Sequence, residues 1–311
     1  MTGLAPLVVI LGPTASGKSA LGIELAKKFN GEVLVCDSTQ IYKHFDVGTG
    51  KIPQHEQQGI AHHLVDLIDP QEIFTAGEYR RRAETVLADL RQRGKLPIVT
   101  AGTGLYLRAL LLGLADTPER SETIRARLRA SSEKHGPTHL HRVLARLDPQ
   151  SAARINSADE QKTIRAIEMR ILAGKTVDEL FAAGRDPLPG FRPVKIGLSP
   201  PRELLYTRIH QRIDAMMQAG WIAEVAELVQ QGIPPEAKPF QFIGYSDWRE
   251  YLVGKISKDE ARNRIQQSTR RFAKRQLTWF RREPDVHWLE GFGESPESFS
   301  AAIEIINSHN C

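Results

Sequence analysis

Residues 7–26 read LVVILGPTASGKSALGIELA: an apolar run, a loop bounded by glycines, and a segment with helical spacing. The loop matches the pattern G-x-x-x-x-G-K-[ST], in which backbone N–H groups turn inward around phosphate oxygens and the following helix directs its positive end at the same place. A chance match in a surface turn is the alternative, but the apolar run before the loop and the helical spacing over residues 18–29 supply the context that the pattern needs. We therefore predict a phosphate site, in which Lys18 neutralises charge and the Ser19 hydroxyl can bind Mg²⁺. The residues of this site are Gly12, Pro13, Thr14, Ala15, Ser16, Gly17, Lys18 and Ser19.

The first third of the chain alternates strand-like and helix-like segments. After the first apolar run, the strand candidates are EVLVC (32–36), the weaker HHLVDL (62–67) and LPIVTAGTG (96–104). Helical patterns cover residues 76–93 and 105–112. Strands that alternate with helices form a parallel sheet covered on both faces. The sequence thus predicts an α/β fold of the P-loop NTPase kind, a parallel sheet flanked by helices.

From about residue 118 the pattern changes. Strand signals disappear, and helical stretches rich in Arg, Glu and Ala continue to the Gly/Pro-rich stretch GRDPLPGFRP (184–193). VKIGL (194–198) then has the pattern of a strand that returns to the sheet, and the remainder is mostly helical. We predict an all-helical insertion domain at 118–193 between a first part of the core at 1–117 and a second part at 194–311.

Composition is that of an ordinary globular protein, with 41% hydrophobic and 25% charged residues among 311, and no apolar run reaches the length of a membrane span. Because the N-terminus also lacks the pattern of a secretory leader, we expect a cytoplasmic protein with no membrane partner, and a monomer. Two cysteines, Cys36 and Cys311, argue against a disulfide framework and fit a reducing compartment. His62 and Asp66 have the spacing of a metal pair on a helix, but two ligands in a strand-like segment do not make a metal site.

Asp37, directly after EVLVC, is the carboxylate that the pattern places beside the phosphates. Residues just beyond the carboxyl ends of parallel strands face the ligand crevice. An ATPase would need an apolar strand ending in a magnesium-supporting Asp, whereas residues 96–100 run into Ala-Gly-Thr-Gly. Asp37 is therefore a candidate general base, and Thr103 a candidate to orient a substrate or that carboxylate. An Asp that caps a turn and a plain glycine turn are the structural alternatives.

The excess positive charge lies near the C-terminus. Residues 258–282 carry nine Lys/Arg against two Asp/Glu, in a chain whose net charge is +5. Ser257 and Glu260 fit a capping box, so we expect a helix from there until Pro284 discourages it. Four of its arginines fall within an arc of roughly 40°: Arg264, Arg271, Arg275 and Arg282. A separate apolar stripe, which we expect to dock on the domain, consists of Ile265, Phe272 and Trp279. Outward arginines suit the phosphates of a nucleic acid, and a solvated charged face is the alternative.

A second group of arginines follows the returning strand. Arg208 and Arg212 share a helix face. They could close over a pyrophosphate, or pair with Glu203 and Asp214.

Five blocks of the sequence resemble, in order and spacing, the signature blocks of the tRNA dimethylallyltransferases, also called tRNA isopentenyltransferases. The blocks are GPTASGKS (12–19), DSTQIYKHFDVGTGK (37–51), HHLVDLIDP (62–70), AGTGLYLRALLLGL (101–114) and TRRFAKRQLTWFRR (269–282). The resemblance implies that the phosphates belong to dimethylallyl pyrophosphate. It also implies that the five-carbon group passes to N6 of the adenine on the 3′ side of the tRNA anticodon.

The resemblance also implies roles for individual residues. Asp37 would remove a proton from the adenine amine, Thr103 would hydrogen-bond at that amine, and Lys18 with Mg²⁺ would stabilise the departing pyrophosphate. Arg208 is added to the pyrophosphate site. The expected contacts with the tRNA anticodon stem-loop are Asp37, Ser38, Thr39, Gln40, Arg125, Gln161, Lys162, Arg165, Gln241, Gly244, Tyr245, Arg271, Lys274, Arg275 and Arg282. From the residues alone, two alternatives to RNA contact remain. The segment at 161–165 could be ordinary helix surface, and FQFIGY (240–245) could be a glycine turn with buried aromatic residues.

Two departures from the family pattern stand out. Ala101 replaces the first glycine of Gly-Gly-Thr-Gly, which is harmless if its φ is negative. Asn156-Ser-Ala-Asp159 and Lys162 stand where the family tends to show His-Pro-Asn-Asp followed by Arg, which weakens the transfer of RNA contacts there.

Three other functions remain open from the residues alone. One is a small-molecule kinase that uses Asp37 as its base, and another is an adenylate prenyltransferase acting on free nucleotide. The third is a nucleotide-regulated RNA-binding protein without catalysis.

Overall fold

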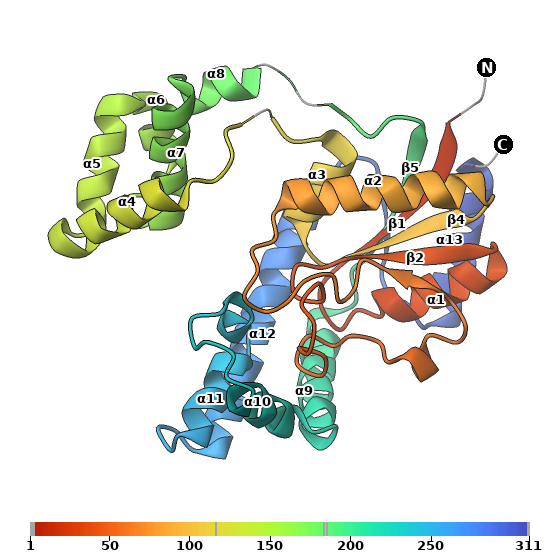
Figure 1. The fold of residues 1–311 in the computed structure, drawn as a ribbon. Coiled ribbons are helices and arrows are strands. Elements are labelled where there is room, and N and C mark those ends of the chain that lie inside the picture. Colours follow the sequence, from red (N-terminus) through yellow and green to blue (C-terminus); the bar gives the residue numbers. More distant parts are fainter. Residues whose placement is uncertain (1–3, 116, 183, 185, 310–311) are drawn as a thin grey trace. The chain divides into compact units, whose positions relative to one another are not determined.

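The structure, a computed structural model, describes residues 4–115, 117–182, 184 and 186–309. They divide into two compact units, one within residues 1–111 and 188–311 and the other within residues 112–187 (Figure 1). Cys311 lies outside the described residues. Among the described residues, no helix combines the length and apolarity needed to cross a bilayer.

The first unit is built on one sheet of six parallel strands, in the order β3-β2-β4-β1-β5-β6. The strands are β1 (Ala5–Leu11), β2 (Gly31–Cys36), β3 (His62–His63), β4 (Leu96–Ala101), β5 (Phe191–Leu198) and β6 (Val286–Leu289). β5 pairs with β1 over seven residues, so the segment that follows the insertion does return to the sheet. The expected α/β fold with a parallel sheet is confirmed.

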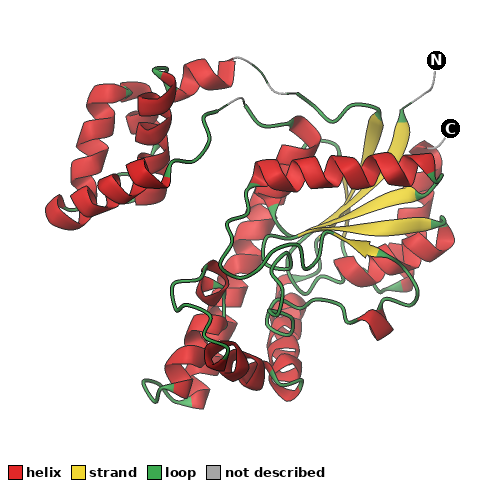
Figure 2. Ribbon diagram, viewed as in Figure 1, coloured by secondary structure: helices red, strands yellow, loops and turns green. Residues whose placement is uncertain are grey.

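Helices cover both faces of the sheet, as Figure 2 shows. Alternate residues of β1 point to opposite sides, with Leu7 and Val9 in one core cluster and Val8 and Ile10 in the other. The first cluster takes most of its helical residues from α2 (Ala76–Gln92) and α3 (Gly104–Leu112), together with Phe280. The second takes them from α1 (Lys18–Lys28) and α13 (Pro296–His309). This two-sided burial explains why the central strands read as continuous apolar runs.

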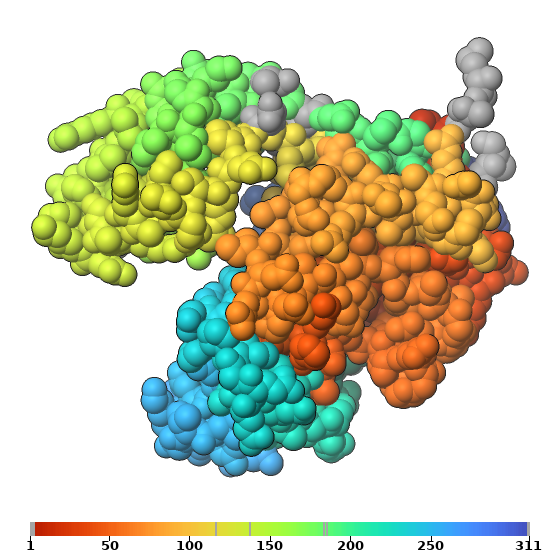
Figure 3. Space-filling view, in the orientation of Figure 1, coloured from red at the N-terminus to blue at the C-terminus, as the bar shows by residue number. Residues whose placement is uncertain are grey.

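A further group of helices packs beyond the carboxyl ends of the strands. It consists of α9 (Arg202–Gln218), α10 (Trp221–Gln230), α11 (Tyr245–Leu252) and α12 (Lys258–Phe280), with the 3₁₀ turn η2 (Lys238–Gln241) between α10 and α11. Their core includes Phe45, which comes from the loop after β2. In the space-filling view, the cyan helical segments and the orange residues of the first half of the unit form one continuous surface (Figure 3).

The second unit is entirely helical in its described part. It contains α4 (Glu122–His135), α5 (Pro137–Leu147), α6 (Pro149–Arg154), α7 (Glu160–Ala173) and α8 (Val177–Ala182), packed around Leu140, Leu144 and Ile167. The two segments of the first unit that flank this helical unit in sequence are hydrogen-bonded to each other: Leu188 N donates to Leu111 O over 3.1 Å.

Two expectations about individual elements are corrected. The strand expected over 62–67 is only two residues long, because Leu64 and Asp66 adopt positive φ angles of 67° and 54° that end the extended backbone. On α12, Ser257 does cap the helix by accepting a hydrogen bond from Glu260 N. Trp279, however, does not belong to a buried stripe, since its side chain is 39% exposed.

Candidate active site

The phosphate loop joins β1 to α1 and adopts the backbone that its glycines permit. Gly12 and Gly17 have φ angles of 154° and 87°, and a methyl group on Gly12 would lie 2.8 Å from Leu198 O. The Ser16 hydroxyl is fully buried with no hydrogen-bond partner, and Gly293 N donates to Ser16 O over 2.9 Å. The loop is thus held from the side of β5 and from the chain after β6.

Lys18 lies inside this loop and its Nζ donates to Pro13 O over 2.7 Å. Burial lowers the pKa of Lys18 to about 7, with the Asp37 carboxylate acting in the opposite direction and the Arg212 cation reinforcing the decrease. Two cations that disfavour each other create a site for an anion that would neutralise both.

Asp37 directly follows β2. One of its carboxylate oxygens is hydrogen-bonded, and the other faces the loop after β4. Oδ1 accepts from Thr39 N and Thr39 Oγ1 over 2.9 and 2.7 Å, so Asp37 does cap its own turn. Oδ2 faces Gly102, where a methyl group would lie 2.4 Å away. Glycine at 102 therefore makes room for the carboxylate, and the turn leaves Oδ2 available for chemistry.

Thr103 is fixed to the segment that carries Asp37. Its Oγ1 accepts from Ser38 N over 2.9 Å and donates to Ser38 Oγ over 3.1 Å. The amides of Gly102 and Thr103 both donate to Cys36 O over 3.0 Å. Ala101 lies in β4 and is not among the positive-φ residues, so its methyl group fits the strand. The candidate base and its threonine neighbour are thus positioned by one set of contacts between two strand ends.

Two further polar residues complete the centre: Gln276, which the sequence analysis did not single out, and Arg212, which it offered as a possible pyrophosphate contact. Gln276 of α12 is buried, its Oε1 accepts from Thr14 N over 2.7 Å, and its Nε2 donates to Gly102 O over 2.8 Å. Arg212 of α9 approaches Thr14 Oγ1 at 3.4 Å and has no acidic partner among the described residues. The alternative in which Arg212 pairs with Asp214 is wrong, because Asp214 pairs with Arg262.

Lys18, Asp37, Arg212 and Gln276 line one cavity of about 350 Å³, whereas Thr103 is not among its lining residues. Its polar wall contains Lys18, Ser19, Asp37, Arg212 and Gln276. Its apolar wall comes from α9, α10, α12 and the segment before α11, and consists of Ile209, Ile213, Met216, Trp221, Phe242, Ile243 and Phe272. The cavity therefore suits a ligand that joins a charged group to a small hydrocarbon.

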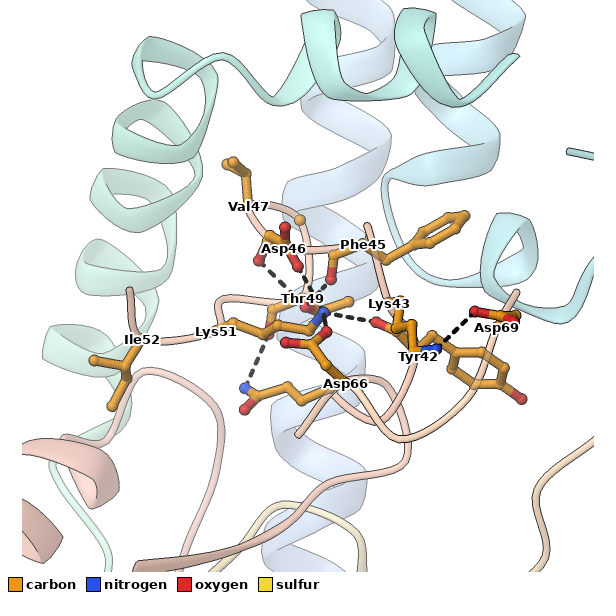
Figure 4. Close-up of polar contacts among 12 residues, drawn as sticks. Tyr42, Lys43, Phe45, Asp46, Val47, Thr49, Lys51, Ile52, Asp66 and Asp69 are labelled. Carbon is orange, nitrogen blue, oxygen red and sulfur yellow. Dashed lines mark hydrogen bonds and ion pairs between the residues drawn. The ribbon is translucent and has the colours of Figure 1, made fainter. Parts of the chain in front are cut away.

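The loop after β2, which forms another side of the cavity, is held by two charged side chains, Lys51 and Glu224. Lys51 Nζ donates to Tyr42 O, Asp46 Oδ1 and Asp66 Oδ1 at 2.6, 2.6 and 2.5 Å, and its side chain is 7% exposed (Figure 4). Glu224 of α10 accepts from the amides of Asp46 and Val47 over 2.9 and 2.7 Å. The turn between Phe45 and Lys51 is thus tied both to the chain after β3 and to α10.

The described residues contain no group of three or more His, Cys, Asp or Glu that could hold a metal ion. The Ser19 hydroxyl is exposed at the start of α1 and lines the cavity. A divalent ion here would therefore depend on that hydroxyl and on oxygens of the ligand itself.

Comparison with known proteins identifies the family. A family model described as IPP transferase matches residues 40–283. The tRNA dimethylallyltransferase of Solibacter usitatus is 48% identical over 299 residues, which cover 96% of this chain and 97% of that protein. The tRNA dimethylallyltransferase of Koribacter versatilis is also 48% identical, over 302 residues that cover 97% of this chain and 98% of that protein. This chain belongs to the IPP transferase family.

Solved structures of related proteins share the fold of this IPP transferase family member. A tRNA isopentenylpyrophosphate transferase from Bacillus halodurans matches with a TM-score of 0.70 at 36% identity, covering 98% of this chain and 94% of that one. A eukaryotic dimethylallyltransferase, crystallised acting on tRNA, matches with a TM-score of 0.83 at 28% identity, covering 98% and 79%. The resemblance drawn from the five sequence blocks is confirmed.

The residues expected to contact RNA lie in different environments in this family member. Gln40 and Gln241 line the cavity, and the α12 cations Arg271, Lys274 and Arg275 are exposed, as is Arg282 just after the helix. Gly244 begins α11, and the Tyr245 ring beside it is fully buried, with its hydroxyl donating to Glu224 Oε1 over 2.7 Å. Arg264, expected to point outward with this group, pairs with Glu250 and Glu260.

Other predicted residues already have partners. In the helical unit, Arg125 and Arg165 both bond the buried carboxylate of Glu168, at 2.9 and 2.7 Å. Lys162 pairs with Asp159, and Gln161 is exposed. In the first unit Arg208 pairs with Glu294, which comes from the chain after β6. An anion would have to displace Glu294 to use Arg208, whereas Arg212 needs no such exchange.

Proposed function

We propose that this enzyme transfers a dimethylallyl group from dimethylallyl pyrophosphate to N6 of the adenine on the 3′ side of the anticodon in tRNA, releasing pyrophosphate. The observation that carries the proposal is the cavity in which Asp37 shares a wall with Lys18 and Arg212, two cations without an ion-pair partner in the part of the chain that the structure describes. Membership of the IPP transferase family supports the same reaction.

The pyrophosphate would bind at the phosphate loop. Lys18 and Arg212 would face its oxygens, and the partial positive charge at the start of α1 would add to theirs. The Thr14 amide already serves Gln276, so the remaining amides of the loop are those available to the ligand. As the bond between the allylic carbon and the pyrophosphate oxygen breaks, these groups would stabilise the charge that collects on the leaving group.

The adenine amine is a poor nucleophile because its lone pair is delocalised into the ring. The C–N bond would form as the C–O bond breaks, and Asp37 Oδ2 would take the proton that the amine loses, so that charge is balanced at each end. Thr103 Oγ1 would orient the amine through a hydrogen bond. The apolar wall of the cavity would surround the five-carbon group and exclude water that could otherwise intercept it.

The chemistry of the site fits a magnesium ion held by the Ser19 hydroxyl and by pyrophosphate oxygens. When bound, the ion would neutralise part of the leaving-group charge. Because tRNA is the acceptor, we propose that the protein works in the cytoplasm.

The deciding experiment supplies the protein with labelled dimethylallyl pyrophosphate and unmodified tRNA, and in parallel with γ-labelled ATP and tRNA or adenosine. We expect label in the tRNA from the first donor alone. Transfer of phosphate from ATP would support a kinase instead, and alkylation of free adenylate in preference to tRNA would support an adenylate prenyltransferase.

Asp37→Ala tests the role of the carboxylate. We expect turnover to fall by about 10²-fold or more, as for the loss of a general base, while tRNA affinity stays within a few-fold of the wild type. Turnover that survives in Asp37→Ala would remove Asp37 from the mechanism. A wild-type protein that binds tRNA and alkylates nothing would leave only a binding function.

A further inference from the structure

The loop between β6 and α13 places a carboxylate against the outer side of the phosphate loop. Gly293 N donates to Ser16 O over 2.9 Å, which ties the two loops together. The next side chain, Glu294, packs against Gly17, where a methyl group would collide with its Oε2. Glu294 also forms an ion pair with Arg208 of α9, and both side chains are partly exposed. A negative charge of the protein therefore already lies beside a site that is built for anions.

This ion pair borders the cations of the candidate active site from a second hollow. That hollow is lined by Glu294 and Arg208 together with Lys18 and Arg212, whereas the cavity described above is lined by Asp37 with the same Lys18 and Arg212. Burial lowers the pKa of Arg212, Asp37 opposes the change, and the charge of Arg208 adds to it. Three cations thus gather at the phosphate loop, and a carboxylate holds one of them.

The proposed donor would compete for that third cation. A diphosphate carries more negative charge than Lys18 and Arg212 neutralise, so its terminal phosphate would attract the Arg208 guanidinium as well. Glu294 now accepts from that guanidinium, and its charge repels an incoming phosphate. Arg208 therefore has two competing anions, one that belongs to the protein and one that belongs to the ligand.

We propose that Glu294 is a displaceable counter-ion, which competes with the terminal phosphate of the donor for Arg208 and so limits how tightly pyrophosphate is held. The inference rests on the proposed function and adds a residue that acts on donor binding and product release. In the free enzyme Glu294 keeps the guanidinium beside the site. When the donor binds, the guanidinium turns to the phosphate and the carboxylate moves into the hollow. After transfer, the return of Glu294 to Arg208 favours departure of pyrophosphate, a step that often limits turnover.

Calorimetric binding of inorganic pyrophosphate tests the competition without any turnover. Glu294→Gln removes the charge and keeps the size of the side chain. The dissociation constant should fall by about 3- to 30-fold, as expected when a like charge is removed from a partly exposed site. Unchanged or weaker pyrophosphate binding by Glu294→Gln would overturn the proposal.

Glu297→Gln is the matched control. Glu297 is exposed in the first turn of α13 and lines neither hollow in the described structure. The same loss of charge should therefore change pyrophosphate affinity by less than about twofold, because screening weakens a charge at that distance. Equal changes in Glu294→Gln and Glu297→Gln would show a general effect of net charge and would overturn the proposal.

Single-turnover kinetics separate competition from a structural role. With labelled donor and unmodified tRNA, the maximal rate in Glu294→Gln should stay within about twofold of the wild type, because the groups at the reacting atoms are unchanged. The donor concentration that gives half of this rate should fall in parallel with the dissociation constant for pyrophosphate. A slower maximal rate with weaker donor binding would indicate that Glu294 only holds the loop in place, and would overturn the proposal.

A crystal structure with inorganic pyrophosphate supplies an independent readout. Arg208 should contact a phosphate oxygen, with the Glu294 carboxylate withdrawn from it. An intact ion pair beside bound pyrophosphate would overturn the proposal. Tighter pyrophosphate binding by Glu294→Gln in a protein that alkylates no tRNA would retain the counter-ion and reject the proposed function, whereas normal alkylation with unchanged pyrophosphate affinity would do the reverse.

Discussion

Lys18 donates its Nζ proton to Pro13 O, and burial lowers its pKa from 10.5 to about 7. A bound pyrophosphate would raise that pKa again, because the anion favours the charged lysine. Below pH 7 the free enzyme already carries the proton, whereas above pH 7 binding must take one up. We therefore expect the dissociation constant for pyrophosphate to increase up to tenfold per pH unit above 7. Calorimetric titrations from pH 6 to 9 would measure it.

The control for this prediction is Lys18→Arg, which keeps its charge throughout the same pH range. Titration of the ligand itself affects both proteins equally and cancels in the comparison. A pH dependence identical in Lys18→Arg and the wild type would show that Lys18 is already protonated in the free enzyme.

Gln276 joins two loops through its side-chain amide: Oε1 accepts a hydrogen bond from the phosphate loop, and Nε2 donates one to the loop after β4. Gln276→Met keeps the length of the side chain and removes both bonds, so the Asp37 carboxylate and the donor should lose their relative alignment. We expect kcat to fall by about 10- to 100-fold, as for small misplacements of reacting groups, with KM for tRNA within threefold. Steady-state kinetics with tRNA as the varied substrate measures both constants.

Gln266 offers a matched control for this variant. It is buried on the same helix and hydrogen-bonds to neither loop in the described structure. Gln266→Met should leave kcat close to that of the wild type. Equal losses of kcat in the two variants would indicate that α12 has been destabilised in general, and would contradict a positioning role for Gln276.

The centre of the site could be predicted from sequence where a local pattern carries the information. Asp37 and Thr103 follow apolar strands, and strand ends of a parallel sheet converge. Gln276 belongs to no such pattern, because its partners at Thr14 and Gly102 are 262 and 174 residues away along the chain. Helical spacing offered Arg212 together with Arg208, but only tertiary packing brings Arg212 to Thr14 and pairs Arg208 with Glu294.

Helix α7 of the second unit carries Glu168, which is fully buried and bonds Arg125, Arg165 and the amide of Ser121. Burial opposes ionisation, but the hydrogen bonds from both arginines and from Ser121 prevail and lower the pKa to about 2. Glu168→Gln leaves two guanidinium groups beside a neutral amide. We expect a loss of about 3 kcal/mol in the stability of this unit, the lower end for a broken buried ion pair. Urea unfolding followed by proteolysis within residues 112–187 would measure the loss.

The same carboxylate predicts how this unit responds to acid. Its ordinary pKa of 4.5 is lowered in the folded state, so its contribution is complete above pH 4.5 and disappears as the pH falls toward 2. Glu122→Gln is the control, since Glu122 pairs with Arg120 and Arg129 at the surface and should contribute less than about 1 kcal/mol. A stability of Glu168→Gln equal to that of the control would contradict the prediction.

At the scale of elements, the sequence indicated where α12 begins and which face it buries, but the seven-residue spacing alone assigned Trp279 wrongly. The start of α12 followed from Ser257, and its buried face from Ile265, which is fully buried. Seven-residue spacing then placed Trp279 on the same stripe, although seven residues advance a straight helix by only about 700° and shift each member by roughly 20°. By Trp279 that drift, together with the contact at Gly104, brings the indole to the margin of the buried face.

For the molecule as a whole, the sheet was predictable because its strands are short, apolar and separated by helices. The order of those strands was not, since residues 112–187 intervene between β4 and β5 and yet β5 lies beside β1. Burial brings β5 back to the sheet, because Val194, Ile196 and Leu198 are fully buried, and the two charged residues of this strand are Arg192 and Lys195. A long insertion between the two strands adds little to the entropic cost of pairing them, because the cost of loop closure grows only logarithmically with loop length.

The hydrogen bond between Leu188 and Leu111 has one more implication. Where the two ends of an inserted segment are joined by a backbone hydrogen bond within the sheet-containing unit, the segment can change without breaking the pairing of β5 with β1. Natural selection could therefore lengthen, shorten or exchange the helical segment without reopening the core. The same junction offers protein engineers a place to graft a foreign module onto this scaffold.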